Sequence, residues 1–200
     1  MSIFKKQIDF GQFIADAISG SINFYDANFD KFIPLVDEFH VLIQKDKEEL
    51  RESGYALIVA DLMVSCQIHF GKIISNEQIG REIGFIYVLF LGKEKHLNKN
   101  EIDRKANELE NLLIALEKNE DKETCRKIGK TKDGLKFLLC STFAELYSGD
   151  NLKDKIVKGK RFAAFKLAKA IIKTDLVRIM LKEFKIKYTP IAEDSSGKTQ

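Results

Sequence analysis

Residues 55–91 form the most apolar part of the chain, and the first half of this stretch reads YALIVADLMVSCQIHF from Tyr55 to Phe70. On a helix, at about 100° per residue, its polar side chains gather on one narrow strip. That strip consists of Asp61, Ser65, His69 and Lys72. A helix that is apolar on nearly all other sides is typical of a buried helix. We therefore predict a helix inside the protein, with Asp61, Ser65 and His69 as a buried polar seam.

The second half of the stretch begins with a helix-entry signal and ends in the apolar run GFIYVLFL, residues 84–91. Ser75 and Gln78 have the spacing of a capping box, in which each side chain bonds the other residue's backbone amide. Short apolar runs also suit strands, but neither run contains a turn signal, which favours helices. The sequence predicts a buried helical hairpin over about residues 55–91, joined near residues 71–75.

Neither run of the hairpin is suited to crossing a membrane. A spanning helix needs about 20 largely apolar residues, and the second run has about half that length. The first run reaches that length only by including Asp61, Gln67, His69 and Lys72, which are costly in lipid. We therefore expect no transmembrane segment.

The composition favours one helical domain. The chain has 200 residues, of which 44% are hydrophobic, and only two prolines. This content can bury a substantial core, and scarce proline with abundant Leu, Ile, Lys and Glu favours helices joined by short loops. We predict an all-α fold: a single compact bundle of about seven or eight helices over residues 1–188. Residues 189–200 are expected to form a disordered tail.

The three cysteines, Cys66, Cys125 and Cys140, are odd in number and widely spaced. This pattern is not a disulfide framework and indicates a reducing compartment. The N-terminal segment lacks the apolar core of a signal peptide, because polar residues interrupt it at Asp9, Gln12 and Asp16. We expect a cytoplasmic protein.

Several boundaries follow from periodicity and from helix breakers. Residues 8–25 and 29–45 have separate amphipathic patterns, and because proline is excluded from a helix interior we expect the second helix to begin near Pro34. The charged segment 45–54 is expected to be a helix end followed by a turn. Later helices are predicted near residues 102–116, 135–147, 151–173 and 176–189, with the longest connection over 118–134.

The charge is unevenly distributed along the chain. Residues 151–188 contain twelve Lys or Arg against three acidic residues, so they carry about +9 while the remainder carries about −6. On a helical wheel, one sector of about 80° holds most of the lysines of the basic helix, with an aromatic side chain among them. The sector contains Lys155, Lys158, Phe162, Lys166, Lys169 and Lys173, and the last helix adds Arg178, Lys182 and Lys185.

These basic residues are a candidate anion-binding face. Lysines with an interleaved aromatic ring could follow a nucleic-acid backbone, or could lie on an anionic membrane surface of acidic lipid. The simpler interpretation is that they solvate the outside of two terminal helices, with their stems covering apolar surface. We favour the simpler interpretation, because basic faces are common and no dedicated nucleic-acid motif is present.

Candidate catalytic and metal-binding patterns are weak. Asp61, Ser65 and His69 stack along one helix, with the outer two about 12 Å apart, and no second element is identified to complete a catalytic set. The more natural interpretation is a structural seam in which a buried Asp61 pairs with Arg81 or with a lysine from another helix. Asp37 and His40 could share a metal, but further ligands are missing. We expect no catalytic residues, no metal and no cofactor.

Three functions remain open at this point. The first is a non-enzymatic protein-interaction module, whose partner is another protein or a second copy of the chain. The second is binding of nucleic acid or of an anionic membrane surface through the basic C-terminal helical face. The third is an enzyme, which would require a deep pocket containing Asp61 or His69. The sequence favours the first.

Overall fold

The computed structural model describes residues 6–122, 131–149, 151, 153–173 and 176–188, and it is predominantly helical. The predicted all-α class is therefore confirmed. The elements follow one another in the order β1 (Lys6–Asp9), α1 (Phe10–Val36), α2 (Gln44–Phe70), α3 (Asn76–Lys93), α4 (Lys99–Asp121), α6 (Lys132–Ser148), α7 (Lys155–Ile171), α8 (Leu176–Glu183) and β2 (Phe184–Lys187).

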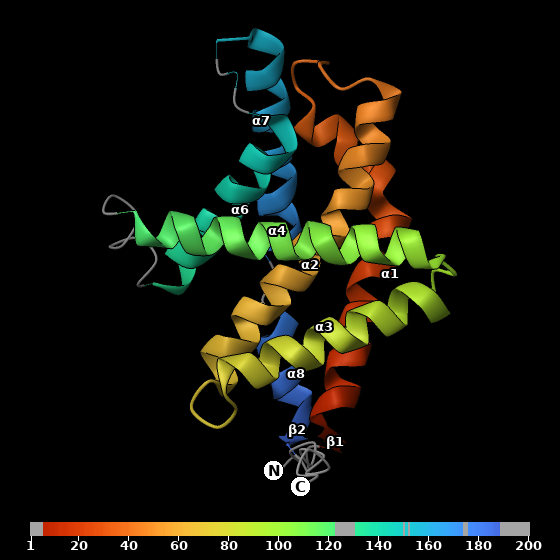
Figure 1. Ribbon diagram of the computed structural model, residues 1–200, viewed down its shortest axis with the longest axis vertical. Helices are drawn as coiled ribbons and strands as arrows, with labels where there is room; N and C mark the ends of the chain where they lie inside the picture. Colours follow the sequence, from red (N-terminus) through yellow and green to blue (C-terminus); the bar gives the residue numbers. More distant parts are fainter. Residues whose placement is uncertain (1–5, 123–130, 150, 152, 174–175, 189–200) are drawn as a thin grey trace, which may run out of the picture.

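Helix α2 lies at the centre of the molecule. It packs against α1, α3, α4, α6, α7 and α8. In Figure 1, α3 and α4 cross in front of α1 and α2, whereas α8 lies behind them. Nearly every residue from Ala56 to Cys66 is buried, as the apolar pattern predicts, because neighbouring helices cover α2 on all sides.

The burial of α2 also helps to decide whether this apolar helix spans a membrane. By length and composition alone, α2 could cross a bilayer, and it is the one helix of the described chain that meets this criterion. However, 67% of the relevant window is buried inside the protein. Core helices of water-soluble proteins meet the same criterion, so this is weak evidence for a membrane span.

Helix α1 corrects the predicted division of the N-terminal region. It is one helix of 27 residues, and Pro34 lies inside its last turn. Its buried face continues without a break through Tyr25, Phe29 and Ile33, and packing of this face outweighs the local effect of proline. The expectation of separate helices over 8–25 and 29–45 is wrong. Residues 45–54 are likewise not a helix end and a turn but belong to the N-terminal part of α2.

Helix α3 is only half-buried. The capping box of Ser75 and Gln78 is present as predicted, and α2 and α3 are joined through residues 71–75. However, α3 buries one face, and Phe85 on the opposite face is 63% exposed. The predicted hairpin is therefore not confirmed as the core of the fold, which α1 and α2 supply in larger part.

The C-terminal half adds a helix pair and a short strand. Helices α6 and α7 pack on each other, with Ala163, Ala164 and Ala168 of α7 buried. Strand β2 follows α8 directly and pairs in parallel with β1, with Ile186 opposite Ile8. Residues 184–187 were expected to be helical, so the strand pair corrects that boundary. The predicted tail, residues 189–200, lies outside the described residues, as do residues 123–130 of the predicted connection over 118–134. The ends of that connection are helical instead, because α4 extends to Asp121 and α6 begins at Lys132.

Candidate functional site

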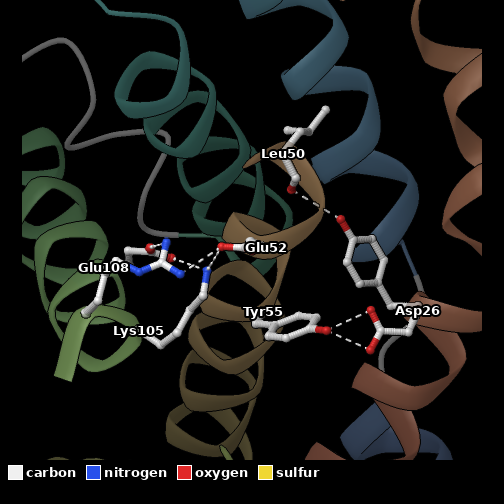
Figure 2. A network of polar contacts seen from close by, with 8 residues as sticks. Asp26, Leu50, Glu52, Tyr55, Lys105 and Glu108 are labelled. Atoms are coloured by element: carbon white, nitrogen blue, oxygen red, sulfur yellow. Dashed lines mark hydrogen bonds and ion pairs between the residues drawn. The ribbon is translucent and has the colours of Figure 1, made fainter. Parts of the chain in front are cut away.

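A polar network joins α1, α2 and α4, and it is the first candidate for a functional site (Figure 2). The Tyr55 hydroxyl oxygen lies 2.8 and 2.7 Å from the two carboxylate oxygens of Asp26. Lys95 Nζ and Arg51 Nε approach the same carboxylate at 2.8 and 3.2 Å. On the other side of Tyr55, the buried Lys105 pairs with Glu52 at 3.1 Å.

The electrostatics of this network indicate a structural role. Burial alone would raise the pKa of Asp26, but the hydrogen bonds from Lys95 and Tyr55 outweigh it and hold the pKa below its usual range. Burial and the Asp26 carboxylate together raise the pKa of Tyr55. Each charge therefore has a fixed opposite partner, as in a satisfied internal network. The sequence did not indicate this site, because Asp26 and Tyr55 meet only through the packing of α1 on α2.

The polar strip of α2 forms the second candidate. Asp61 pairs with Lys136 of α6, whose Nζ lies 3.1 Å from Asp61 Oδ1, so the partner is a lysine from another helix. Lys136 Nζ also donates to the Ile172 carbonyl at 3.0 Å. Ser65 is 2% exposed, and its hydroxyl makes no hydrogen bond to any residue that the structure describes. His69, one turn further on, is half-buried.

Asp61 and Ser65 lie in the wall of a cavity of about 480 Å³ between α1, α2, α8 and the C-terminal end of α7. The cavity contains Asp61, as the enzyme hypothesis requires, but His69 does not line it. A serine nucleophile needs a base within hydrogen-bonding distance. Ser65 has no such partner within the described ranges, so the three strip residues are not arranged as a nucleophile with its base.

The predicted basic face forms the third candidate, and the structure divides it. Its ends are exposed: Lys155, Lys158, Lys169, Lys173, Arg178, Lys182 and Lys185. Its middle contacts the segment between α1 and α2. Lys166 forms an ion pair with Glu38 of that segment. The Phe162 ring, 41% exposed, packs edge-on against Phe39 at 5.6 Å and beneath the Lys166 ammonium at 5.3 Å.

A groove between α3 and α4 forms the fourth candidate, which sequence reasoning missed. It has a volume of about 390 Å³, and its wall includes Gly84 and Val88 of α3 and Ala106, Leu113 and Ile114 of α4. Both helices lie on the same face of the molecule (Figure 1). The amphipathic pattern of α4 was visible in the sequence, but which of its apolar residues stay uncovered depends on how α3 crosses it.

Candidate metal ligands do not come together. Within the described residues, no group of three or more His, Cys, Asp or Glu side chains is placed to hold a metal ion. Asp37 instead accepts hydrogen bonds from the backbone amides of Val41 and Leu42, at 2.9 and 3.3 Å, and so closes the turn after α1. Compared with known proteins, the chain matches no family model, no curated protein and no solved structure.

Proposed function

We propose that this protein is a non-enzymatic interaction module and that the α3–α4 groove receives an amphipathic helix of another protein. The observation that carries the proposal is the uncovered apolar surface of the groove. Val88 and Ile114 in its wall are 38% and 42% exposed, and the neighbouring Phe85 and Leu89 are 63% and 37% exposed. Contiguous apolar surface of this kind marks interaction sites.

The apolar lining of the groove suits an amphipathic helix. The groove lies between the packed helices α3 and α4, and amphipathic helices dock in apolar grooves through side chains spaced three and four residues apart. The α3 backbone is uncovered at Gly84, because an added Cβ at this position would meet no atom within 4 Å. A large apolar side chain of the partner can therefore approach the α3 backbone closely.

The charge around the groove selects the partner. Two exposed carboxylates of α4, Glu110 and Glu117, line it, and the lining contains no cationic residue of the described chain. Complementary charge favours the correct partner and disfavours others. We therefore propose a partner helix whose apolar face is flanked by Lys or Arg.

The test uses two labelled helical peptides with the same apolar face and either basic or acidic flanks, measured by fluorescence anisotropy. The basic peptide should bind with micromolar affinity and the acidic peptide should not. The Gly84→Leu variant should weaken binding of the basic peptide at least tenfold, because the new side chain fills the groove.

The matched control is Gly20→Leu, because position 20 is also an open helical glycine but faces the cavity on another side of the protein. It should leave peptide binding unchanged. Equal binding of both peptides, or equal binding by the wild type and Gly84→Leu, would contradict the proposal. Concentration-dependent dimerisation abolished by Gly84→Leu would identify a second copy of the chain as the occupant instead.

A second candidate function is anion binding through the exposed ends of the basic face. Lys155, Lys158, Lys169 and Lys173 are exposed, whereas Lys166 is paired with Glu38. Anisotropy with short labelled nucleic acids at several salt concentrations tests this idea, with acidic vesicles as a separate arm. Binding that falls steeply with salt and is lost when these four lysines become Glu would support it. Absence of binding to both probes at low salt would reject it.

We further propose that the protein works in the cytoplasm. Cys66 and Cys140 are buried in the helical packing. An odd number of widely spaced cysteines, two of them buried in this way, suits a reducing compartment, in which thiols persist.

A further inference from the structure

We propose that the cavity between α1, α2, α7 and α8 binds a small apolar molecule that carries one hydrogen-bond-donating head group. The site is separate from the α3–α4 groove and does not depend on the proposed function. Its volume of about 480 Å³ falls within the range of small-molecule sites.

The walls of the cavity are mainly apolar. Ile58 and Leu62 of α2 face Ile171 at the end of α7 and Val177 and Met180 of α8. Phe24 of α1 also lines the cavity and is 65% exposed. Such walls favour a ligand whose body is hydrocarbon or aromatic, because binding removes apolar surface of both ligand and protein from water.

The polar part of the wall contains a hydroxyl without a partner. Ser65 is 2% exposed, and its Oγ makes no hydrogen bond to a residue within the described ranges. A buried hydroxyl in this state costs free energy that a bound polar group recovers. The Ser65 hydroxyl in the cavity wall is therefore the observation that points to a ligand.

The neighbouring charges define the head group. Asp61 lies one turn from Ser65, and its carboxylate forms an ion pair with Lys136. Asp16 is a second carboxylate in the wall, and no described Lys or Arg lines the cavity. Because the charged side chains that line the cavity are both carboxylates, an anionic head is disfavoured, whereas an O–H or N–H donor would bond the Ser65 hydroxyl. An alcohol and an amine share this chemistry.

Position 20 allows the cavity to be filled without disturbing the fold. Gly20 lies in the α1 wall, and an added Cβ there would meet no atom within 4 Å. Gly20→Leu should therefore fold normally while occupying space that the ligand needs. Ser65→Ala removes the hydroxyl alone and leaves the apolar walls intact.

The test is a fluorescence titration of the full chain with N-phenylnaphthylamine, an apolar fluorophore with one N–H donor, followed by displacement with decanol, decylamine or decanoate. Saturable binding is expected, with displacement by decanol or decylamine and at least tenfold weaker displacement by decanoate. Preference between decanol and decylamine distinguishes a neutral from a cationic head.

The variants decide between a specific site and general apolar adsorption. Gly20→Leu should abolish fluorophore binding, and Ser65→Ala should weaken it about five- to tenfold, the loss of one hydrogen bond. Gly84→Leu and Ser53→Ala, which lie outside this cavity, should bind as the wild type does. No saturable binding, equal displacement by decanoate, or unchanged binding by both Gly20→Leu and Ser65→Ala would overturn the proposal.

Discussion

The Asp26 carboxylate lies at the centre of a network of hydrogen bonds and ion pairs. Three side chains from outside α1, Tyr55, Lys95 and Arg51, converge on its carboxylate. Removing the shared partner of these half-buried charges is costly, because Lys95 and Arg51 lose their counter-ion while partly shielded from water. Asp26 therefore holds α1 against α2 and the segment after α3.

The Asp26→Asn variant tests this role. The amide keeps the shape of the side chain but removes the charge that Lys95 and Arg51 require. We expect a loss of about 2–3 kcal/mol in the free energy of unfolding. Tyr55→Phe, which removes only one hydrogen bond to Asp26, should cost about 1 kcal/mol. Urea unfolding measures both, and a loss near zero for Asp26→Asn would show that solvent compensates the missing charge.

The lowered pKa values of Asp26 and Glu52 predict a pH dependence of stability. Burial opposes both shifts, but hydrogen bonds and ion pairs outweigh it: Lys95 and Tyr55 at Asp26, and Lys105 and Arg104 at Glu52. The folded state therefore holds these protons less tightly than the unfolded state does. Their stabilisation is complete above the unfolded pKa values of about 4 and is lost as pH falls through the folded values.

Urea midpoints measured between neutral pH and pH 3 check this sign. The midpoint should fall with pH in the wild type and should fall less steeply in Asp26→Asn, which lacks one of the two carboxylates. Parallel pH profiles for the two proteins would mean that Asp26 titrates alike in the folded and unfolded states.

At the scale of elements, the sequence predicted what depends on local pattern. The apolar run of α2 and the Ser75–Gln78 cap both appear where expected. Both features depend on residues close together in the sequence, so the sequence pattern indicates them directly. The predicted helix boundary near Pro34 was wrong, because packing of the apolar face of α1 outweighs the local preference of proline against a helix interior. The cavity was not predictable, since it forms between helices distant in sequence. The groove lies between the consecutive helices α3 and α4, and it was not predictable because their packing decides which apolar residues stay uncovered.

Two glycines in these helices should respond oppositely to alanine. Gly54 of α2 faces Tyr25 of α1, and an added Cβ would overlap the Tyr25 hydroxyl oxygen. Because Tyr25 is 2% exposed and cannot easily move, Gly54→Ala should destabilise the protein by about 1–3 kcal/mol. Gly84→Ala meets no atom and should stabilise α3 by about 0.5–1 kcal/mol through helix propensity.

Thermal unfolding of the two alanine variants compares them directly. Both changes remove the same backbone freedom from the unfolded chain, so the difference between them isolates the contact with Tyr25. Similar unfolding temperatures for the two variants would show that α1 and α2 are less closely packed at this crossing than the structure places them.

At the scale of the whole molecule, the parallel pair of β1 and β2 connects the first described element with the last. The two strands lie together at one end of the molecule (Figure 1). Ile8 and Ile186, opposite each other in this pair, pack against the core. Because β2 follows α8 without a break, the strand pair also holds α8 over the cavity. The order of α8 at the cavity therefore depends on a strand near the N-terminus.

The Ile186→Asp variant tests this coupling. A charge at this half-buried position should weaken the strand pair and cost about 1–3 kcal/mol in the free energy of unfolding. It should also speed dissociation of N-phenylnaphthylamine from the cavity, because α8 is held less firmly. Ile179→Asp, an exposed position of α8 itself, is the matched control and should change both quantities little. If Ile186→Asp lowers stability but leaves the dissociation rate unchanged, α8 is held by its packing on α2 alone, and the strand pair stabilises the fold without controlling access to the cavity.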